Sequence, residues 1–576
     1  MTTAVLSVFV PLGAACALAA LAPFTRRRAG WTPVVVMAAT AALLAVTLAR
    51  PGPRLDFVFG GWAPRVGVVF AIDGIGGGLA LFVAVLGVVA LAVAARTIVV
   101  ESLAFDALML VFIGAMIGFC LTGDLFNLFV FFELMGVAAY VLVAYEVRRR
   151  AALEGALTFA VTNTVGSILL LFGIALLYGH TGALNLAQIG RAVGPDPATP
   201  VRVAFALLAC GLLVKAAVVP FHLWTADAYA VAPTPVCILL AGAFSELGLY
   251  GLARVYWTVF DGALDVRAVL LVAGLLTAVV GAVMCAVQHH LKRMLAFATI
   301  AQVGLFLTGL GLTTAGGVAG TALWVVGDGL VKAGLFACVA ILRQRFGDVE
   351  AADLHGRGPR GVGVVFVVGA LAIASLPPSG PFLAKAVLED AALAAGYPWL
   401  PAALLVVTGV VGGTLLRVAA QVFWGLGAPP PHDPAGEEPR DETARESERG
   451  GAGLLPVLAG ALMAAGVAWG LVPGLRTAAG RAAAVFTDRH GYAAAVLGGR
   501  APHVAPVELA PPGATAYLYA AGSLALALAV AAVGLWRGRH APAPVQALRR
   551  LHNGRPGDYV AWTVLGAAIL AAVFAF

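Results

Sequence analysis

Apolar stretches of membrane-spanning length recur from one end of the chain to the other, and they restrict its fold more than any other feature. A helix needs about 20 mainly apolar residues to cross a bilayer. Of the 576 residues, 61% are hydrophobic and 11% are charged, whereas soluble proteins carry about 25% charged residues. The short alternating strands of a membrane β-barrel are not seen in the sequence. The chain is therefore predicted to be an all-α polytopic membrane protein.

We expect about sixteen spans, each close to the length that crosses a bilayer. They are predicted at residues 4–22, 32–49, 72–95, 104–121, 124–145, 153–178, 201–221, 232–257, 266–287, 294–313, 319–342, 361–376, 400–424, 452–472, 515–536 and 558–576. The twelfth is expected to continue, broken, to residue 395. An even number of spans would place both ends of the chain outside the cell.

Basic residues account for the net charge of +7, and they fall in every second connection between the spans. Examples are Arg26 to Arg28, Arg148 to Arg150 and the stretch 537–555. Membrane proteins concentrate Lys and Arg in their cytoplasmic loops. No basic stretch is interleaved with aromatic residues in a soluble domain, so the charge predicts membrane topology rather than nucleic-acid binding. The first apolar run precedes its basic cluster, so we expect a retained span rather than a cleaved signal peptide.

The sequence contains no motif for a redox cofactor, a nucleotide or a metal ion. Its six cysteines each stand alone in apolar segments, and no C-x-x-C pair occurs. Iron–sulfur clusters and thiolate zinc sites need grouped cysteines. We therefore expect no cofactor and no metal, and we expect any redox chemistry to lie on partner chains.

Six charged residues are predicted to lie within spans, away from the polar ends of the helices. They are Glu133, Lys215, Glu246, Asp328, Lys332 and Lys385. An ionised side chain at mid-bilayer costs roughly 2.5–3.5 kcal/mol on insertion scales, so such residues are usually functional. Glu133 is about ten residues from either end of its span, which is roughly 15 Å deep. Asp328 and Lys332 are four apart and share one helix face.

Two interpretations of these charges are open. They could be static ion pairs, with Glu133 neutralising Lys215 and Asp328 neutralising Lys332. They could instead form a relay, in which a carboxylate beside a desolvated lysine switches it between holding and releasing a proton. Opposite charges spread over five spans favour the relay. His222 and Asp227 could gate its entrance or simply form a helix-end hydrogen-bond network, and Lys292 could join them or snorkel to the surface as an anchor.

Prolines predict that two spans are broken. One ends at Pro220, just after Lys215, and the other contains Pro377, Pro378 and Pro381 ahead of Lys385. Proline removes a backbone donor, and irregular backbone in a membrane must be buried in protein or line a wet cavity. Interrupted spans in both halves of a chain are typical of inverted-repeat transporters. Both breaks carry a Pro-Phe step, Pro220-Phe221 and Pro381-Phe382.

Five stretches occur in an order that is similar to one known family. They are LFVFFELMGVAAYVLVAYE, VKAAVVPFHLWTADAYAVAPTPV, HHLKRMLAFATIAQVGLFLTGLG, GDGLVKAGLFACVAIL with RFGDVEAADLHGRG, and SLPPSGPFLAKAVLED. Over about residues 55–425, the chain resembles the antiporter-like membrane subunits of respiratory complex I, membrane-bound [NiFe] hydrogenases and Mrp cation/proton antiporters. The stretch FGGWAPRVGVVFAIDGIGG favours the D-type Mrp members and the hydrogenase-type members.

The resemblance implies an antiporter-like core of about fourteen helices with two inverted five-helix repeats, each containing a broken helix, plus about two extra C-terminal spans. It implies that Glu133 is the essential glutamate, that Lys215 is the central lysine, and that Lys332 and Lys385 belong to the second half. Two positions depart from the family pattern. Glu246 stands where a lysine is expected, and Asp328 stands where a histidine is frequent. We therefore expect a working but altered proton connection between the two half-channels.

On this resemblance the chain divides into five parts. They are N-terminal peripheral spans (1–103), a first half-channel (104–257), a second half-channel (258–425), a polar cytoplasmic linker (426–451) and C-terminal spans with an outer loop (452–576). We expect a proton- or sodium-translocating subunit of a respiratory or hydrogenase-type complex in the plasma membrane, with other membrane subunits as partners. The alternatives are a D-type component of an Mrp Na+/H+ antiporter and a non-pumping structural subunit. The 537–557 connection is too short for the long lateral arm of the largest such complex I subunit.

Overall fold

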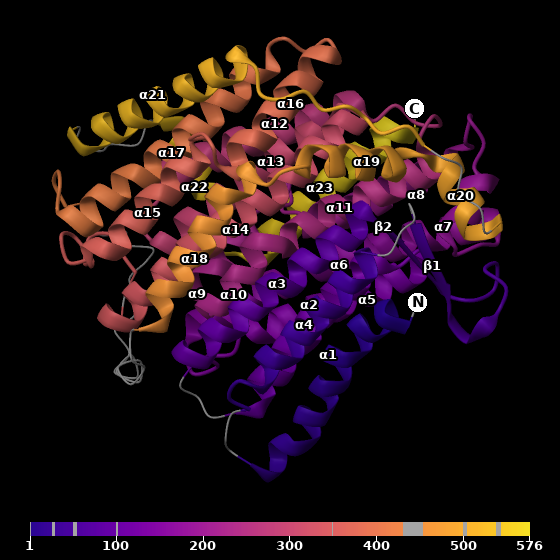
Figure 1. The fold of residues 1–576 in the computed structure, drawn as a ribbon, viewed down its shortest axis with the longest axis horizontal. Helices are drawn as coiled ribbons and strands as arrows, with labels where there is room; N and C mark the ends of the chain where they lie inside the picture. Colours follow the sequence, from indigo (N-terminus) through magenta and orange to yellow (C-terminus); the bar gives the residue numbers. More distant parts are fainter. Residues whose placement is uncertain are drawn as a thin grey trace.

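The computed structural model describes residues 2–25, 29–49, 54–98, 102–347, 349–429, 453–498, 504–536 and 543–575, and these are nearly all helical (Figure 1). Thirteen of its helices are long and apolar enough to cross a membrane. The other predicted spans are the 17-residue helix Thr32–Leu48 and the two broken ones. Every predicted span is thus helical. Most of the linker 426–451, Arg26 to Arg28 and residues 537–542 lie outside the described residues.

The N-terminal part contains three helices and a small hairpin. Its elements are α1 (Thr2–Leu21), α2 (Thr32–Leu48), β1 (Arg54–Val58), β2 (Val69–Asp73) and α3 (Gly74–Thr97). The strands pair antiparallel with Arg54 opposite Asp73. The hairpin was not predicted, and the predicted span 72–95 began two residues too early. Asp73 ends β2, and its carboxylate accepts hydrogen bonds from the amides of Ile75 and Gly76, so it caps α3.

Two groups of five spans follow in the same order. The first comprises α4 (Leu103–Leu121), α5 (Leu125–Val143), α6 (Arg150–Thr181), the broken α8–α9 (Thr199–Lys215, Trp224–Val231) and α10–α11 (Thr234–Leu239, Ser245–Val255), with the short α7 (Leu186–Ala192) after α6. The second comprises α12 (Arg267–Val287), α13 (Leu291–Gly311), α14 (Ala315–Phe346), the broken α15–α16 (Arg360–Ile373, Gly380–Ala394) and α17 (Leu400–Trp424).

The two helix breaks have the same backbone geometry. Each first half-helix is followed by a non-glycine residue with positive φ, Ala217 at 59° and Ser375 at 69°. In both, the next amide donates to the carbonyl five residues earlier, over 3.1 and 2.9 Å. This pattern aligns Pro220 with Pro378 rather than with Pro381, so the two Pro-Phe steps seen in the sequence are not equivalent positions.

The helices before the breaks also match. The first residue of α5 donates its amide to Leu184, and the first residue of α13 donates to Val349, which gives an isolated antiparallel bridge in each group. Helices α6 and α14 both have 32 residues, and both end on a left-handed glycine, Gly182 and Gly347. The second five-span group therefore repeats the local structure of the first.

The core lies where these two groups meet. The stretch Thr234–Phe260 and helix α13 are buried on all sides, and α14 nearly so. A helix that is apolar all round belongs inside such a structure. By contrast, α1 and the last helices are mostly exposed at the periphery, as expected for surfaces that face lipid.

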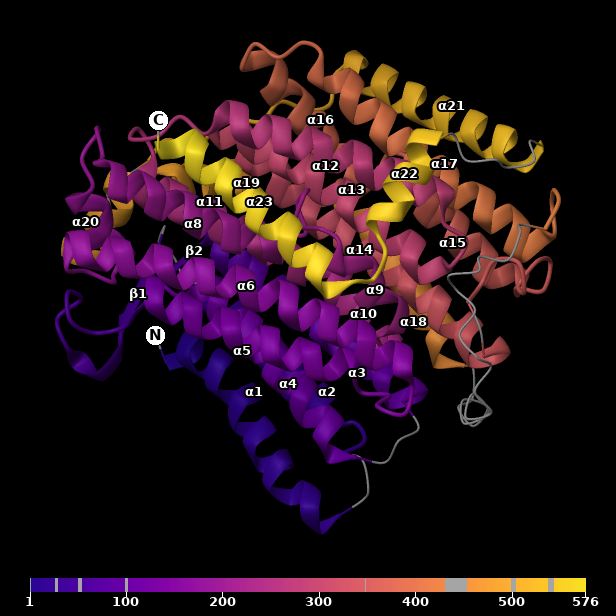
Figure 2. The same ribbon diagram turned by 180° about the vertical axis from the view of Figure 1, so that it is seen from behind.

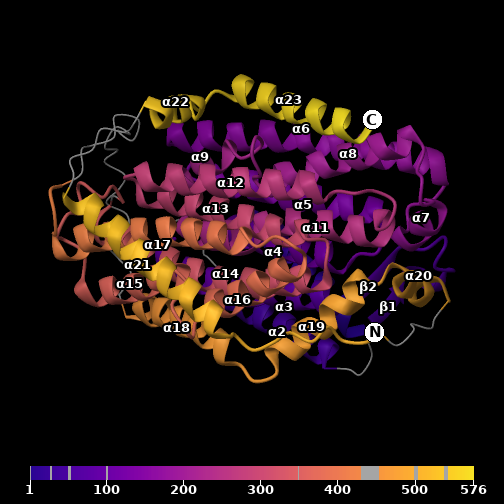
Figure 3. The same ribbon diagram turned by 90° about the horizontal axis from the view of Figure 1, so that it is seen from above.

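The C-terminal part wraps around this core. Its helices are α18 (Leu454–Ala468), α19 (Leu475–Thr487), α20 (Arg489–Gly498), α21 (Ala514–Trp536), α22 (Ala543–Leu551) and α23 (Pro556–Ala575). Figure 2 shows α23 running along α6 and α8, and Figure 3 shows α21 across α17 on the other side. The outer connection 473–514, for which no structure was predicted, contains α19 and α20.

Candidate functional site

Lys215 is the last residue of α8 and is fully buried. Its ammonium nitrogen lies 4.1 Å from the ring centre of Phe132 and 4.6 Å from that of Phe244. Both aromatic faces stabilise a cation, and the partial negative charge at the C-terminus of α8 does the same. Within the described part of the chain, the nitrogen has no hydrogen-bond partner. The ammonium is therefore stabilised without being held by a fixed contact.

Glu133 lies on α5 and is half-buried. A Cβ atom added to Gly136, one turn further along α5, would lie 3.2 Å from the Lys215 nitrogen. Glu133 acts electrostatically on Lys215, but the two do not form a hydrogen bond. The static contact pair considered from the sequence is thus not what the geometry contains.

Lys332 on α14 is the centre of a buried three-residue cluster. Its nitrogen lies 3.0 Å from Oε1 of Glu246 and 2.8 Å from Oδ2 of Asp328. All three side chains are at most 1% exposed. The cluster joins α11 to α14 across the two five-span groups. Glu246 follows a π-helical turn, Leu240–Phe244, and such turns are frequent at functional sites.

Lys385 lies on α16, beyond the second break. Its ammonium donates a hydrogen bond to Oγ of Ser523 at 2.7 Å and lies 3.6 Å from Glu389. Ser523 belongs to α21 and also contacts Thr408 at 3.2 Å. Lys385 was predicted from the sequence, whereas Ser523, a single hydroxyl in an apolar run, gave no signal that it would reach a lysine.

The three predicted entrance residues lie around α9. His222 contacts His552 through their Nε2 atoms at 3.1 Å, and the phenol of Tyr559 donates to Asp227 at 3.0 Å. Lys292 is 1% exposed and does not snorkel to the surface. It donates instead to the carbonyls at the end of α9, so the anchor interpretation is wrong and the lysine caps that helix.

The helices that carry these residues are in close contact. A Cβ atom on Gly248 of α11 would lie 2.6 Å from the amide nitrogen of Ala216, so α11 packs against the end of α8. A Cβ atom on Gly327 of α14 would lie 3.0 Å from Gly380, so α14 packs against the start of α16. Phe132 of α5 lies against Lys215 of α8, and Glu246 joins α11 to α14 through its ion pair. Helices α5, α8, α11, α14 and α16 thus form a continuous series that carries all six mid-span charges.

Several buried polar atoms on this series and on the neighbouring α13 have no protein hydrogen-bond partner among the described residues. They include Oε2 of Glu246, Oδ1 of Asp328 and both amide atoms of Gln302 on α13. Buried polar groups are almost always satisfied, commonly by ordered water. Gln302 was not among the predicted site residues, although a glutamine at the centre of an apolar span is itself a signal.

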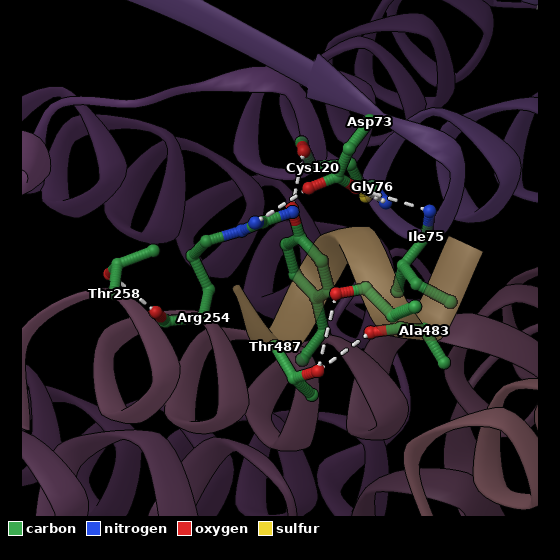
Figure 4. A network of polar contacts seen from close by, with 10 residues as sticks. Asp73, Ile75, Gly76, Cys120, Arg254, Thr258, Ala483 and Thr487 are labelled. Carbon is green, nitrogen blue, oxygen red and sulfur yellow. Dashed lines mark hydrogen bonds and ion pairs between the residues drawn. The ribbon is translucent and has the colours of Figure 1, made fainter. Parts of the chain in front are cut away.

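Another buried ion pair, also missed from the sequence, lies beside the end of strand β2 (Figure 4). The guanidinium of Arg254 contacts the Asp73 carboxylate at 2.7 Å and lies 4.2 Å from the Phe486 ring centre. Tyr250 donates to the Cys120 carbonyl at 2.6 Å in the same network. These contacts tie β2, α4, α11 and α19 together. They stabilise the packing of these elements and involve none of the six mid-span charges.

The family described as "NADH:quinone oxidoreductase/Mrp antiporter, TM" matches residues 122–412, the part that contains both breaks and all six charges. The chain belongs to this family. The N subunit of NADH-quinone oxidoreductase from Desulforudis audaxviator is 34% identical over 418 residues, 71% of this chain and 82% of that protein. The D subunit of the Na(+)/H(+) antiporter from Alkalihalophilus pseudofirmus is 29% identical over 68% of this chain and 80% of that protein.

Among solved structures, one chain of the Mrp complex from a Dietzia species has a TM-score of 0.75 and 28% identity. The match covers 86% of this chain and all of that one. Several further N subunits match over 59% to 66% of their own length. The chain is thus an antiporter-like, multi-pass subunit of the complex I and Mrp type, located in the plasma membrane, and its relatives are components of multisubunit membrane complexes.

Proposed function

We propose that this chain moves protons, or sodium ions, across the membrane as one subunit of a respiratory or hydrogenase-type complex. The single observation that carries the proposal is Lys215, a fully buried ammonium at a helix break with no hydrogen-bond partner in the described residues. A lysine kept only for stability would be paired, because an unpaired buried charge is costly. Glu133, on the neighbouring helix, is the carboxylate that can bias its protonation.

The proton path follows the helix series. A proton reaches Lys215, and the charge of Glu133 decides how firmly Lys215 holds it. The next acceptor is the Glu246–Asp328–Lys332 cluster, where three ionised groups would leave a buried net charge of −1. One added proton removes that charge, so the cluster is suited to accept it. Lys385 and Glu389 form the last pair.

The gaps between these groups require water. The unpartnered oxygens of Glu246 and Asp328 and the amide of Gln302 are the positions at which water would bind. Their presence on α11, α13 and α14 supports a hydrated connection between the halves.

The two five-span groups support an inverted repeat. Each contains an odd number of spans, so the second begins on the opposite side of the membrane from the first. The boundaries proposed for the half-channels are 104–257 and 258–425, flanked by peripheral spans at 1–103 and, after the linker, at 452–576.

An Mrp-type antiporter subunit is the second candidate function. The full coverage of the Dietzia Mrp chain and the match to the D subunit of an antiporter favour it. Mild solubilisation of native membranes, capture of the tagged chain and identification of its partners would separate the candidates. Dehydrogenase or hydrogenase subunits would support the first, and small cation-antiporter subunits the second.

The captured complex also tests transport itself. In sealed inside-out vesicles, energised as the identified partners require, the wild-type complex should acidify the vesicle lumen. A complex that assembles and turns over without moving any ion would leave the chain as a structural subunit.

A further inference from the structure

Three contacts connect the C-terminal helices to the predicted path. Ser523 of α21 contacts Lys385, His552 contacts His222, and Tyr559 of α23 contacts Asp227. The C-terminal member of each pair lies beyond residue 412, where the family match ends. Two of the contacts converge on one place, the α9 side of the first break, which α23 covers in Figure 2.

Helix α23 packs closely against that break. A Cβ atom on Gly566 would lie 2.8 Å from Cγ of Pro220 and 2.7 Å from Cε1 of Phe221. Only a glycine allows this approach. Further along α23, the Phe574 ring packs edge-on against Phe205 of α8 at 5.1 Å. At the start of α23, the Tyr559 phenol accepts from the amide of Gly554 in the preceding turn and donates to Asp227, so the turn that carries His552 is tied to the same place.

The imidazole of His552 connects the molecular surface to a buried site. His552 is half-buried in a turn whose next residues, Asn553 and Gly554, are exposed. His222 is only 5% exposed. The two Nε2 atoms are 3.1 Å apart, and Nδ1 of His552 lies 3.0 Å from the carbonyl oxygen of Leu548. The ring thus has one nitrogen toward the end of α22 and the other toward His222.

The same turn belongs to the basic side of the molecule. Arg549, Arg550 and Arg555 flank His552, and its ring packs at 5.2 Å against Phe297, four residues after Arg293. Basic connections mark the cytoplasmic face. Water on that face can therefore reach the exposed turn far more readily than it can reach His222, which is only 5% exposed.

We propose that His552 is a proton-relay residue that takes protons from the cytoplasm and passes them to His222, and that Tyr559 positions Asp227 beside this entrance. This rests on the proposed function. In the transfer, cationic His552 gives its Nε2 proton to Nε2 of neutral His222. His552 is then neutral, with its remaining proton on Nδ1, where the Leu548 carbonyl accepts a hydrogen bond. His222 becomes the cation and carries the proton to the break.

Chemical rescue separates a relay from a packing role. His552→Ala removes both the relay and the ring, and we expect proton uptake by inside-out vesicles of the whole complex to fall about tenfold. Imidazole added to the medium reaches the exposed cytoplasmic turn and should restore most of the rate. His552→Gln keeps an amide of similar size but cannot carry a proton, so it should be as slow as His552→Ala. His180→Ala, an exposed histidine at the end of α6, is the matched control and should be unaffected.

Two results would overturn the relay. One is an assembled His552→Ala complex with the wild-type rate. The other is a slow His552→Ala complex that imidazole does not rescue, together with a fully active His552→Gln complex, because a packing role alone gives that pattern. Lys215→Met in the same vesicles separates a failure of the relay from a failure of the proposed function. If it abolishes uptake while His552→Ala does not, only the relay fails; if it leaves uptake intact, the proposed function fails.

Discussion

The two helix breaks share a backbone but hold their lysines differently. Lys215 precedes the first break and packs between two aromatic rings without a hydrogen-bond partner among the described residues. Lys385 follows the second break and donates to Ser523 at 2.7 Å, with Glu389 nearby. The shared backbone fixes where irregular structure occurs. The position of the lysine relative to it decides which contacts the ammonium makes, and on the proposed function these contacts set how freely it exchanges its proton.

Both breaks are covered by a C-terminal segment through glycine. Gly566 of α23 lies against Pro220 in the first. Gly470, in the short turn after α18, lies against the carbonyl of Pro378 in the second. Irregular backbone in a membrane needs such cover, because lipid cannot satisfy it. Two unrelated C-terminal segments therefore pack at equivalent positions of the two breaks.

The largest expected effect is at Lys215. Lys215→Met should lower ion transport by about 100-fold, as for loss of a group that donates and accepts protons. Lys215→Arg should be equally inactive, because arginine keeps the charge but does not release its proton in proteins. The measurement is pH-dye quenching in inside-out vesicles, normalised to assembled complex. Arg360→Met, at the exposed start of α15, is the control. An active Lys215→Arg complex would mean that the positive charge, and not proton exchange, is what the first break needs.

A smaller effect is expected at the cluster that joins the halves. Glu246→Gln keeps the shape and an oxygen toward Lys332 but removes one charge, so assembly should persist. Transport should fall about tenfold, equivalent to about 1.4 kcal/mol. Asp328→Asn, which alters the other carboxylate, allows the two to be compared by a double-mutant cycle. Unchanged transport in Glu246→Gln would remove this residue from the path and leave the halves connected in another way.

The sequence predicted the spans, the breaks and six candidate charges because each is a local signal. Long apolar runs, interior prolines and costly mid-span charges can be read without knowing any neighbour. The contacts of Glu246 with Lys332 and of His222 with His552 could not be read, because they join residues 86 and 330 positions apart. The helices α19 and α20 were also missed, because with 13 and 10 residues they are too short to give the signal of a membrane span.

The close packing of α23 on the first break depends on Gly566. Gly566→Ala places a Cβ atom against Pro220 and Phe221, and the overpacking should destabilise the complex by about 1 kcal/mol. Gly557→Ala is a matched control on the same helix, since nothing lies within 4 Å of its Cβ position. Thermal unfolding of the detergent-solubilised complex, followed by size-exclusion chromatography, would compare them. Equal melting of the two variants would show that α23 is not pressed against the break.

The smallest expected effect is at Ser523, the hydroxyl that holds Lys385. Ser523→Ala removes the acceptor of the Lys385 ammonium, together with the weaker contacts of the hydroxyl to Thr408 and to the Leu405 carbonyl. Buried hydrogen bonds between membrane helices average about 0.6 kcal/mol, so the loss of the Lys385 contact corresponds to roughly a threefold change. If the hydroxyl restrains the ammonium, the variant should transport faster or slower by about that factor while α21 stays in place. Thr563→Ala on α23 removes a hydroxyl bonded only within its own helix and serves as the control. A Ser523→Ala complex as inactive as Lys215→Met would contradict this expectation. It would mean that transport depends on the hydrogen bond of Lys385 as strongly as it depends on Lys215 itself.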